Sequence, residues 1–466
     1  MRNTAAFLVL AFAAAVATLV AQSSQPKSST LQIPFESYAL PNGLRVVLAP
    51  NNTSPTVAVT VWYHVGSKNE AKGKTGFAHL FEHVMFTGSG HVPYGEHDRL
   101  TEGVGGSNNG TTSRDRTMYF ETIPSNYLET ALWLESDRMG FLLDTLDIQK
   151  LNAQRDIVKN ERRQSMDNQP YGLVDEIVSN TLYPAAHPYS WDVIGSMTDL
   201  TAASETDVKE FFKRYYAPAN AIVSIAGDFQ PQQAKPLVAR YFGEFPRGPA
   251  IVRPAAPPVT LDRETRLVYE DRVQVPRLVI VWPTVGRQSD DRFALRVLDQ
   301  IVAGPRTTRL TKALVYDRQL ATSITARQDP DESAGEWRLT ITPRPGVSLT
   351  DLEAATDAIL DTLKAEGPTG EEIQRATAGL ELGFVNGLES NLGRSMRLAD
   401  GLGYDNDAGS FQTEYQKMLA VTPADVKRVA NKYLTKGRIV LSVVPIGKKE
   451  MASKPSESTP YRRTDQ

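Results

Sequence analysis

The stretch Asp207-Val-Lys-Glu-Phe-Phe-Lys-Arg-Tyr215 recurs, 218 positions later, as Asp425-Val-Lys-Arg-Val-Ala-Asn-Lys-Tyr433. Both copies have apolar residues at helical spacing, and both lead into a strand-like apolar run, residues 221–226 and 439–443 respectively. Two amphipathic helix-then-strand units can resemble each other by chance. The same order of elements around both copies nevertheless favours a duplicated unit.

Further patterns extend the two copies outward. Residues 38–48 predict a hairpin that turns at Asn42-Gly43, and residues 56–62 predict a strand whose echo is 277–282, each ending in tryptophan. Helical patterns occupy 75–86, 125–142, 147–167 and 205–216.

The duplication predicts the domain organisation. Residues 248–258 hold four prolines, which favour an extended linker. We therefore predict an α+β fold of two homologous domains, 33–247 and 259–448, each a mainly antiparallel sheet packed against helices on one face, with a polar tail at 449–466.

Composition excludes several functions. The 466 residues carry 51 Lys+Arg against 54 Asp+Glu, so no basic surface for nucleic acid is expected. There is no cysteine, which removes disulfides, thiolate metal sites and cysteine nucleophiles. A metal would need His, Asp or Glu, and all six histidines lie in the first 187 residues.

Residues 1–24 are typical of a secretory signal peptide. One Arg precedes an apolar run from Ala5 to Ala21, and small residues at Ala15, Ala17 and Ala21 suit cleavage. An uncleaved anchor is the alternative, because the run is near the shortest length that spans a bilayer. No other segment of the sequence predicts a membrane span. We expect a protein in the periplasm of a Gram-negative bacterium, or a secreted one.

A short motif carries the chemistry. His79-Leu-Phe-Glu82-His83 lies in a helical pattern with Thr75 at the expected N-cap and Gly88 past its end. Histidines four residues apart share one helix face and can bind one zinc ion. Glu82 lies beside that face, where a carboxylate could take a proton from zinc-bound water. Two buried histidines with a surface glutamate are the alternative.

A catalytic zinc needs a third protein ligand, another His or a carboxylate. Leu151, Gln154, Val158 and Glu161 lie on one helical stripe, so Glu161 continues an apolar face. A carboxylate there needs a cationic partner or a metal, and an ion pair with an Arg explains it equally well.

The zinc motif, with Glu161 following 78 residues after His83, resembles the pitrilysin/insulinase (M16) metallopeptidases, specifically half-length members similar to mitochondrial processing peptidase. The resemblance covers residues 35–445. The matching segments are Gly105-Gly-Ser-Asn-Asn-Gly-Thr-Thr-Ser113 with Thr117 and Tyr119, residues 134–139, residues 158–163, and His187-Pro-Tyr with Ile194-Gly195.

The resemblance implies a zinc endopeptidase for short or unfolded peptides, with one Zn²⁺ per chain held by His79, His83 and Glu161 and with Glu82 as general base. It implies a clamshell around an enclosed chamber. It also assigns Asn109, Gly110 and Thr111 to an edge strand that pairs with substrate backbone. Family members often have Ala at the position of Gly110. The other histidines, His64, His91, His97 and His187, are expected in loops, strands or a turn.

Two departures from the family pattern bear on mechanism. Gln154 replaces a glutamate that assists the site in the family. In the second half, Val315 and Thr322 stand where the family has an Arg/Tyr pair for the tetrahedral oxyanion, and Tyr316 and Arg318 are out of register. We therefore predict a homologous partner subunit, in a heterodimer or heterotetramer, that supplies Arg and Tyr in trans. Without a partner, another residue could compensate, or Tyr316 could serve after a local shift. The alternative functions are a catalytically silent structural or peptide-binding member of the family and a metal-binding protein without a peptide partner.

Overall fold

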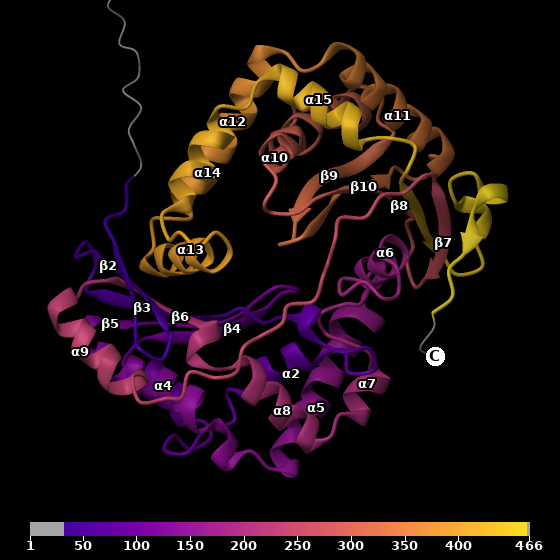
Figure 1. The fold of residues 1–466 in the computed structure, drawn as a ribbon. Coiled ribbons are helices and arrows are strands. Elements are labelled where there is room, and N and C mark those ends of the chain that lie inside the picture. Colours follow the sequence, from indigo (N-terminus) through magenta and orange to yellow (C-terminus); the bar gives the residue numbers. More distant parts are fainter. Residues whose placement is uncertain (1–31, 464–466) are drawn as a thin grey trace, which may run out of the picture. The chain divides into compact units, whose positions relative to one another are not determined.

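Two six-stranded sheets organise the computed structural model, which describes residues 32–463 (Figure 1). The predicted signal peptide lies outside the described residues. The first sheet has the order β1-β2-β6-β3-β5-β4. Its strands are β1 (Glu36–Ala39), β2 (Arg45–Pro50), β3 (Thr56–Tyr63), β4 (Ser107–Thr112), β5 (Thr117–Pro124) and β6 (Ala221–Gly227). β1 and β2 form the predicted hairpin.

The second sheet repeats the first. Its strands are β7 (Thr265–Asp271), β8 (Arg277–Val285), β9 (Ala321–Pro330), β10 (Ala334–Pro343), β11 (Ile439–Pro445) and β12 (Thr459–Pro460). Their order is β12-β7-β11-β8-β10-β9, so the series β7-β11-β8-β10-β9 matches β2-β6-β3-β5-β4. The first pair of each series is parallel and the other pairs are antiparallel. The α+β prediction of two similar, mainly antiparallel units is confirmed.

The ladders correct one detail of the predicted repeat. Trp62 pairs with Ile222 in the first sheet, and Ile280 pairs with Val440, the residue 218 positions after Ile222, in the second. Ile280 therefore occupies the position of Trp62, and Trp282 lies two residues beyond it. The tryptophans lie on equivalent strands but are not equivalent residues.

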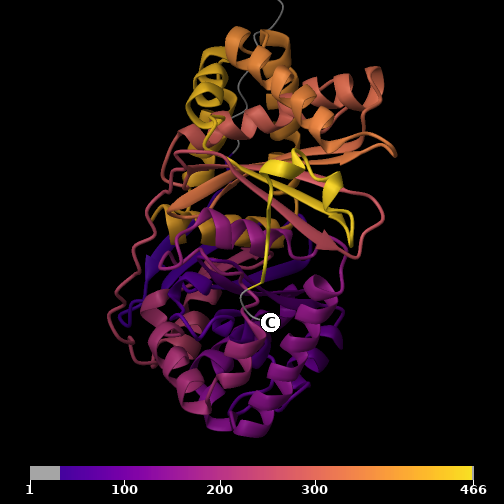
Figure 2. The same ribbon diagram turned by 90° about the vertical axis from the view of Figure 1, so that its right-hand side faces the viewer.

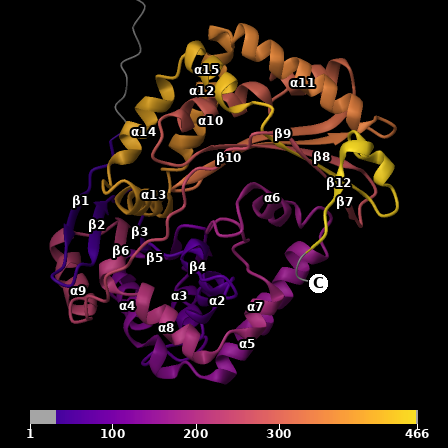
Figure 3. The same ribbon diagram turned by 45° about the vertical axis from the view of Figure 1, so that its right-hand side comes forward.

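The helices of the first half are α2 (Phe77–Val84), α3 (Glu96–Glu102), α4 (Leu128–Thr145), α5 (Ile148–Arg162), α6 (Val174–Leu182), α7 (Met197–Ala202), α8 (Glu205–Tyr215) and α9 (Pro231–Phe242). Those of the second half are α10 (Asp291–Val302), α11 (Leu349–Glu366), α12 (Gly370–Asn386), α13 (Asn391–Tyr404), α14 (Ser410–Leu419) and α15 (Pro423–Tyr433). Figure 3 shows α10, α11 and α15 on one face of the second sheet.

The recurring Asp of the opening stretch is a helix-capping residue. Ser204 and Asp207 form a capping box at the start of α8, and Thr422 and Asp425 form the same box at the start of α15. Each satisfies backbone N–H groups that the first helical turn leaves without partners. Local chemistry therefore explains why this part of the repeat stayed recognisable.

Helix α13, from the second half of the chain, packs against the first sheet through β3 and β6 (Figure 1). Ser395 donates to the hydroxyl of Thr60 at 2.8 Å, and Trp62 Nε1 donates to Asp400 at 3.0 Å. The expectation of helices on one face is therefore wrong for the first sheet. β3 is buried on both faces because alternate residues point to opposite sides, and α13 covers the second side.

The linker and the tail differ in structure. No helix or strand is assigned between α9 and β7, in the part of the chain where the prolines predict an extended segment. In the polar tail, β12 pairs in parallel with β7, and Figure 2 shows this yellow segment beside the second sheet. Within residues 32–463, none of the helices combines the length and the apolar character that a membrane span requires.

Candidate metal centre

Helix α2 begins at a glycine, which corrects the predicted cap. Gly76 is the N-cap with φ 88°, and Thr75 instead bonds Asp199 through its N–H and its hydroxyl. The buried carboxylate of Glu70 accepts the N–H groups of Gly76 at 3.0 Å and Ala78 at 2.8 Å. A Cβ on Gly76 would lie 2.6 Å from the carbonyl oxygen of Ile194, so the close approach of two backbones also requires glycine.

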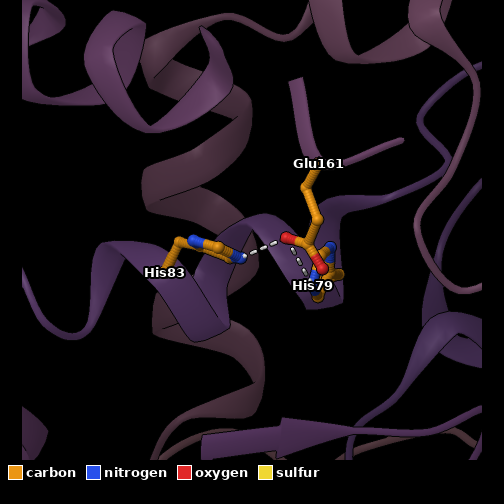
Figure 4. Close-up of side chains that lie close together, drawn as sticks. All are labelled: His79, His83 and Glu161. Carbon is orange, nitrogen blue, oxygen red and sulfur yellow. Dashed lines mark ion pairs between the residues drawn. The ribbon is translucent and has the colours of Figure 1, made fainter. Parts of the chain in front are cut away.

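The structure brings His79, His83 and Glu161 together (Figure 4). His83 Nε2 lies 3.2 Å from Glu161 Oε2, and His79 Nε2 lies 3.8 Å from the same oxygen. The imidazole rings are 4.8 Å apart and nearly perpendicular, at 86°. The i,i+4 spacing on α2 produces this arrangement, as the sequence predicts.

These residues fit a zinc ion. Tetrahedral coordination with bonds of about 2.0–2.2 Å separates ligand atoms by about 3.3–3.6 Å, close to the two distances that Glu161 makes. Burial, with repulsion from His83, lowers the pKa of His79 to about 4. Burial also lowers the pKa of His83, although Glu161 opposes the shift. Both imidazoles are therefore neutral at pH 7, the form that binds metal.

Glu161 reaches the histidines from α5, whose N-terminus Asp147 caps. Leu151, Gln154 and Val158 are buried along the predicted stripe, but the side chain of Glu161 is 44% exposed. The premise that Glu161 is buried is therefore wrong, because the stripe leaves the core at the last turn of the helix. The structure gives Glu161 two imidazole partners and no arginine among the described residues.

Glu82 is held against the edge of the first sheet. Thr112 on β4 donates its hydroxyl hydrogen to Glu82 Oε2 at 2.5 Å. Burial raises the pKa of Glu82, and this hydrogen bond opposes the rise. A Cβ on Gly110 would lie 2.9 Å from Glu82 Cγ, so Gly110 leaves room for the carboxylate.

The predicted substrate strand is β4, the edge strand of its sheet, which pairs with β5 alone. The N–H of Gly110 donates to the side chain of Asn109 at 2.8 Å, and an Arg116 guanidinium donates to the carbonyl of Thr111 at 2.9 Å. A pocket of about 270 Å³ beside the strand is lined by Glu82, His83, Phe86, Asn108 and Asn109.

Of the two family departures, Gln154 lies on α5 with Glu161, whereas Val315 and Thr322 lie in the second half of the chain. Val315 lies in a π-helical turn, Thr311–Asp317, and Thr322 on β9 donates to the carbonyl of Thr342. Tyr316 is exposed, with the guanidinium of Arg306 4.5 Å from its ring centre.

The remaining histidines have structural contacts. His64 follows β3 and donates to Glu332 at 2.7 Å, His91 bonds Asp137 at 2.6 Å, and His187 packs a turn by accepting the N–H of Tyr189. His97 was expected in a loop or strand but lies in α3.

A second buried group, which no motif in the sequence predicts, consists of His97, Glu121 and Glu135. Three separate elements bring these residues together, and Arg138 makes a two-point ion pair with Glu135. The guanidinium stacks on Tyr119, 4.5 Å from its ring centre. Because Arg138 already supplies a positive charge, we regard this group as structural.

Comparisons with known proteins match this fold and site. The sequence model described as "Insulinase (Peptidase family M16)" matches residues 45–188, and that of the "Peptidase M16 inactive domain" matches residues 202–380. The zinc protease PqqE of Helicobacter pylori is 31% identical over 422 residues, which cover 90% of this chain and 92% of that protein. Mitochondrial-processing peptidase subunit beta of Blastocladiella emersonii is 25% identical over 432 residues, 89% of each chain.

The fold has the same relatives. A crystal structure of a protease from Helicobacter pylori superposes with a TM-score of 0.83 at 29% identity, covering 89% of this chain and all of that one. The class is therefore that of two-domain M16-like peptidases, several of whose members are named zinc proteases. The chain belongs to peptidase family M16.

Proposed function

We propose that this chain is the zinc-bearing subunit of an endopeptidase that cleaves short or unfolded peptides in an enclosed chamber. The observation that carries the proposal is the convergence of His79, His83 and Glu161 beside Glu82, at an edge strand. One zinc ion per chain would be held by these three residues. The names of the relatives support the same chemistry.

A peptide added to the free edge of β4 would replace the bond between the Gly110 N–H and the Asn109 side chain. This places a scissile bond beside Glu82, which accepts a proton from the attacking water and passes it to the leaving amine. The raised pKa of Glu82 suits both steps, and Thr112 fixes the position of its carboxylate. When bound, zinc supplies the Lewis acid that polarises the carbonyl and activates the water.

The partner is part of the proposal. Val315 and Thr322 occupy the positions of the family's Arg/Tyr pair and cannot donate in the same way, so a homologous subunit supplies that pair. The relative named subunit beta supports this assembly by analogy. The N-terminal sequence supports export, and we place the mature protein in the periplasm.

The test is cleavage of an internally quenched peptide by the chain alone and by the chain co-expressed with a homologue that has the Arg/Tyr pair. Glu82→Gln should abolish cleavage while one zinc per chain remains by elemental analysis. Full activity of the chain alone would refute the partner. Bound zinc without cleavage in either preparation would instead support the silent peptide-binding member.

A further inference from the structure

A second, larger pocket lies in the other half of the chain. It has a volume of about 650 Å³, and most of its lining residues belong to α10, α12, α13 and α14. These four helices are labelled in Figures 1 and 3. It shares no lining residue with the pocket at Glu82. The charged residues that line it are Arg287, Arg292, Arg296, Arg397, Asp400 and Glu414.

The carboxylates do not balance the arginines. Glu414 pairs with Arg287 at 2.8 Å, Arg292 at 2.7 Å and Arg397 at 3.3 Å, and Asp405, which does not line the pocket, also pairs with Arg287 at 3.2 Å. Asp400 is bonded to the indole of Trp62. Arg296 is exposed and has no ion pair within residues 32–463. Four arginines therefore meet three carboxylates, Asp400, Asp405 and Glu414, which leaves a surplus of one positive charge at the pocket.

Three of the four guanidinium groups stack on aromatic rings, and Arg287 lies over the ring of Tyr404 at 4.8 Å. Arg292 lies over the ring of Phe293 at 4.3 Å, and Arg397 over the ring of Phe384 at 4.9 Å. Burial, with repulsion from Arg287, lowers the pKa of Arg397 even though Glu414 opposes the shift. Fixed guanidinium groups with too few carboxylates favour an added anion.

Two glycines of α12 form part of one wall of the pocket, called the glycine wall below. Gly379 and Gly383 lie one turn apart on α12, and a Cβ on either would meet no atom within 4 Å. Glycine inside a helix costs about 1 kcal/mol relative to alanine. These glycines are not explained by close packing of a neighbour. They leave an open path along the helix, beside the arginines.

We propose that this pocket binds an acidic segment of a peptide, with a Glu or Asp carboxylate against Arg296 and Arg397 and the peptide backbone along the glycine wall. The volume is of the size that encloses a small ligand or a short peptide segment. This inference rests on the proposed function for the identity of the ligand as a peptide. It adds a preference for acidic substrates, set by a pocket that shares no lining residue with the pocket at Glu82.

The test measures binding without cleavage. A fluorescent peptide of alternating Glu and Leu, and the same peptide with Gln for Glu, are titrated by anisotropy against the full chain carrying Glu82→Gln. We expect the acidic peptide to bind about tenfold tighter at low salt, and this advantage to shrink as salt is added. Arg296→Gln should remove most of it, whereas Arg263→Gln, an equal charge change at an exposed arginine outside the pocket, should not.

A second variant tests the glycine wall. Gly383→Leu places a side chain in open space, so the urea midpoint should stay equal or rise while binding of the acidic peptide is lost. Equal affinity for the two peptides, or equal effects of Arg296→Gln and Arg263→Gln, would overturn the proposal. Release of the peptide by inorganic phosphate at constant ionic strength, as readily as by unlabelled peptide, would also overturn it. This experiment measures binding and needs no cleavage. A negative result in the peptidase assay therefore does not affect the interpretation of the binding result.

Discussion

We expect the hydrogen bond from Thr112 to Glu82 to contribute a measurable part of the catalytic rate. Thr112→Val removes the hydroxyl but keeps the β-branched shape that suits a strand, so the fold should be unaffected. Hydrogen bonds to charged groups contribute about 1.5–3 kcal/mol when buried. Glu82 is only partly buried, so we take about 1.4 kcal/mol, which corresponds to a tenfold loss in kcat/KM.

The assay is cleavage of the quenched peptide in the preparation that is active, with zinc content and the urea midpoint measured in parallel. Thr112→Ser keeps the donor and should restore most of the activity. If Thr112→Val stays within twofold of the wild type, or if Thr112→Ser is equally impaired, Thr112 does not position Glu82. Thr112→Val should keep its zinc, because Thr112 has no hydrogen bond to any of the three proposed ligands. Loss of zinc in this variant would show that the substitution disturbs the metal site and not only the position of Glu82.

Three other predictions concern metal and stability. Glu161→Gln should lower bound zinc well below one per chain without lowering the urea midpoint of the metal-free protein; full retention of zinc would exclude Glu161 as a ligand. Gly403→Ala should destabilise the fold by about 1–3 kcal/mol, because its Cβ would lie 2.6 Å from Trp62. Gly379→Ala adds a methyl group in open space and should not destabilise the fold. Equal losses of urea midpoint in Gly403→Ala and Gly379→Ala would contradict the close packing of Gly403 against Trp62. Burial opposes ionisation of Glu332, but His64 and Lys68 outweigh it and hold its pKa at about 2. This contribution to stability is present above pH 4.5 and lost as pH falls toward 2, so the difference in urea midpoint between the wild type and Glu332→Gln should narrow below pH 4.5.

Local chemistry made much of the fold and the site predictable. Capping boxes at α8 and α15 depend on residues three apart, so the repeat could be read directly from the chain. The same is true of His79 and His83, whose common face follows from one helical turn. The prediction of Thr75 as the N-cap of α2 is wrong because the carboxylate that accepts the N–H of Gly76 belongs to Glu70, which precedes the helix.

The local elements, the duplication and the zinc motif can all be read from the order of the amino acids, because the patterns that reveal them involve residues a few positions apart. Tertiary contacts were needed to show that α13 covers the first sheet, that Glu161 approaches the histidines from a partly exposed position, and that Thr112 holds Glu82. They also create the arginine pocket, whose walls come mostly from four helices. These features depend on contacts between distant segments, and hydrophobic periodicity says which face of a helix is buried but not which partner buries it.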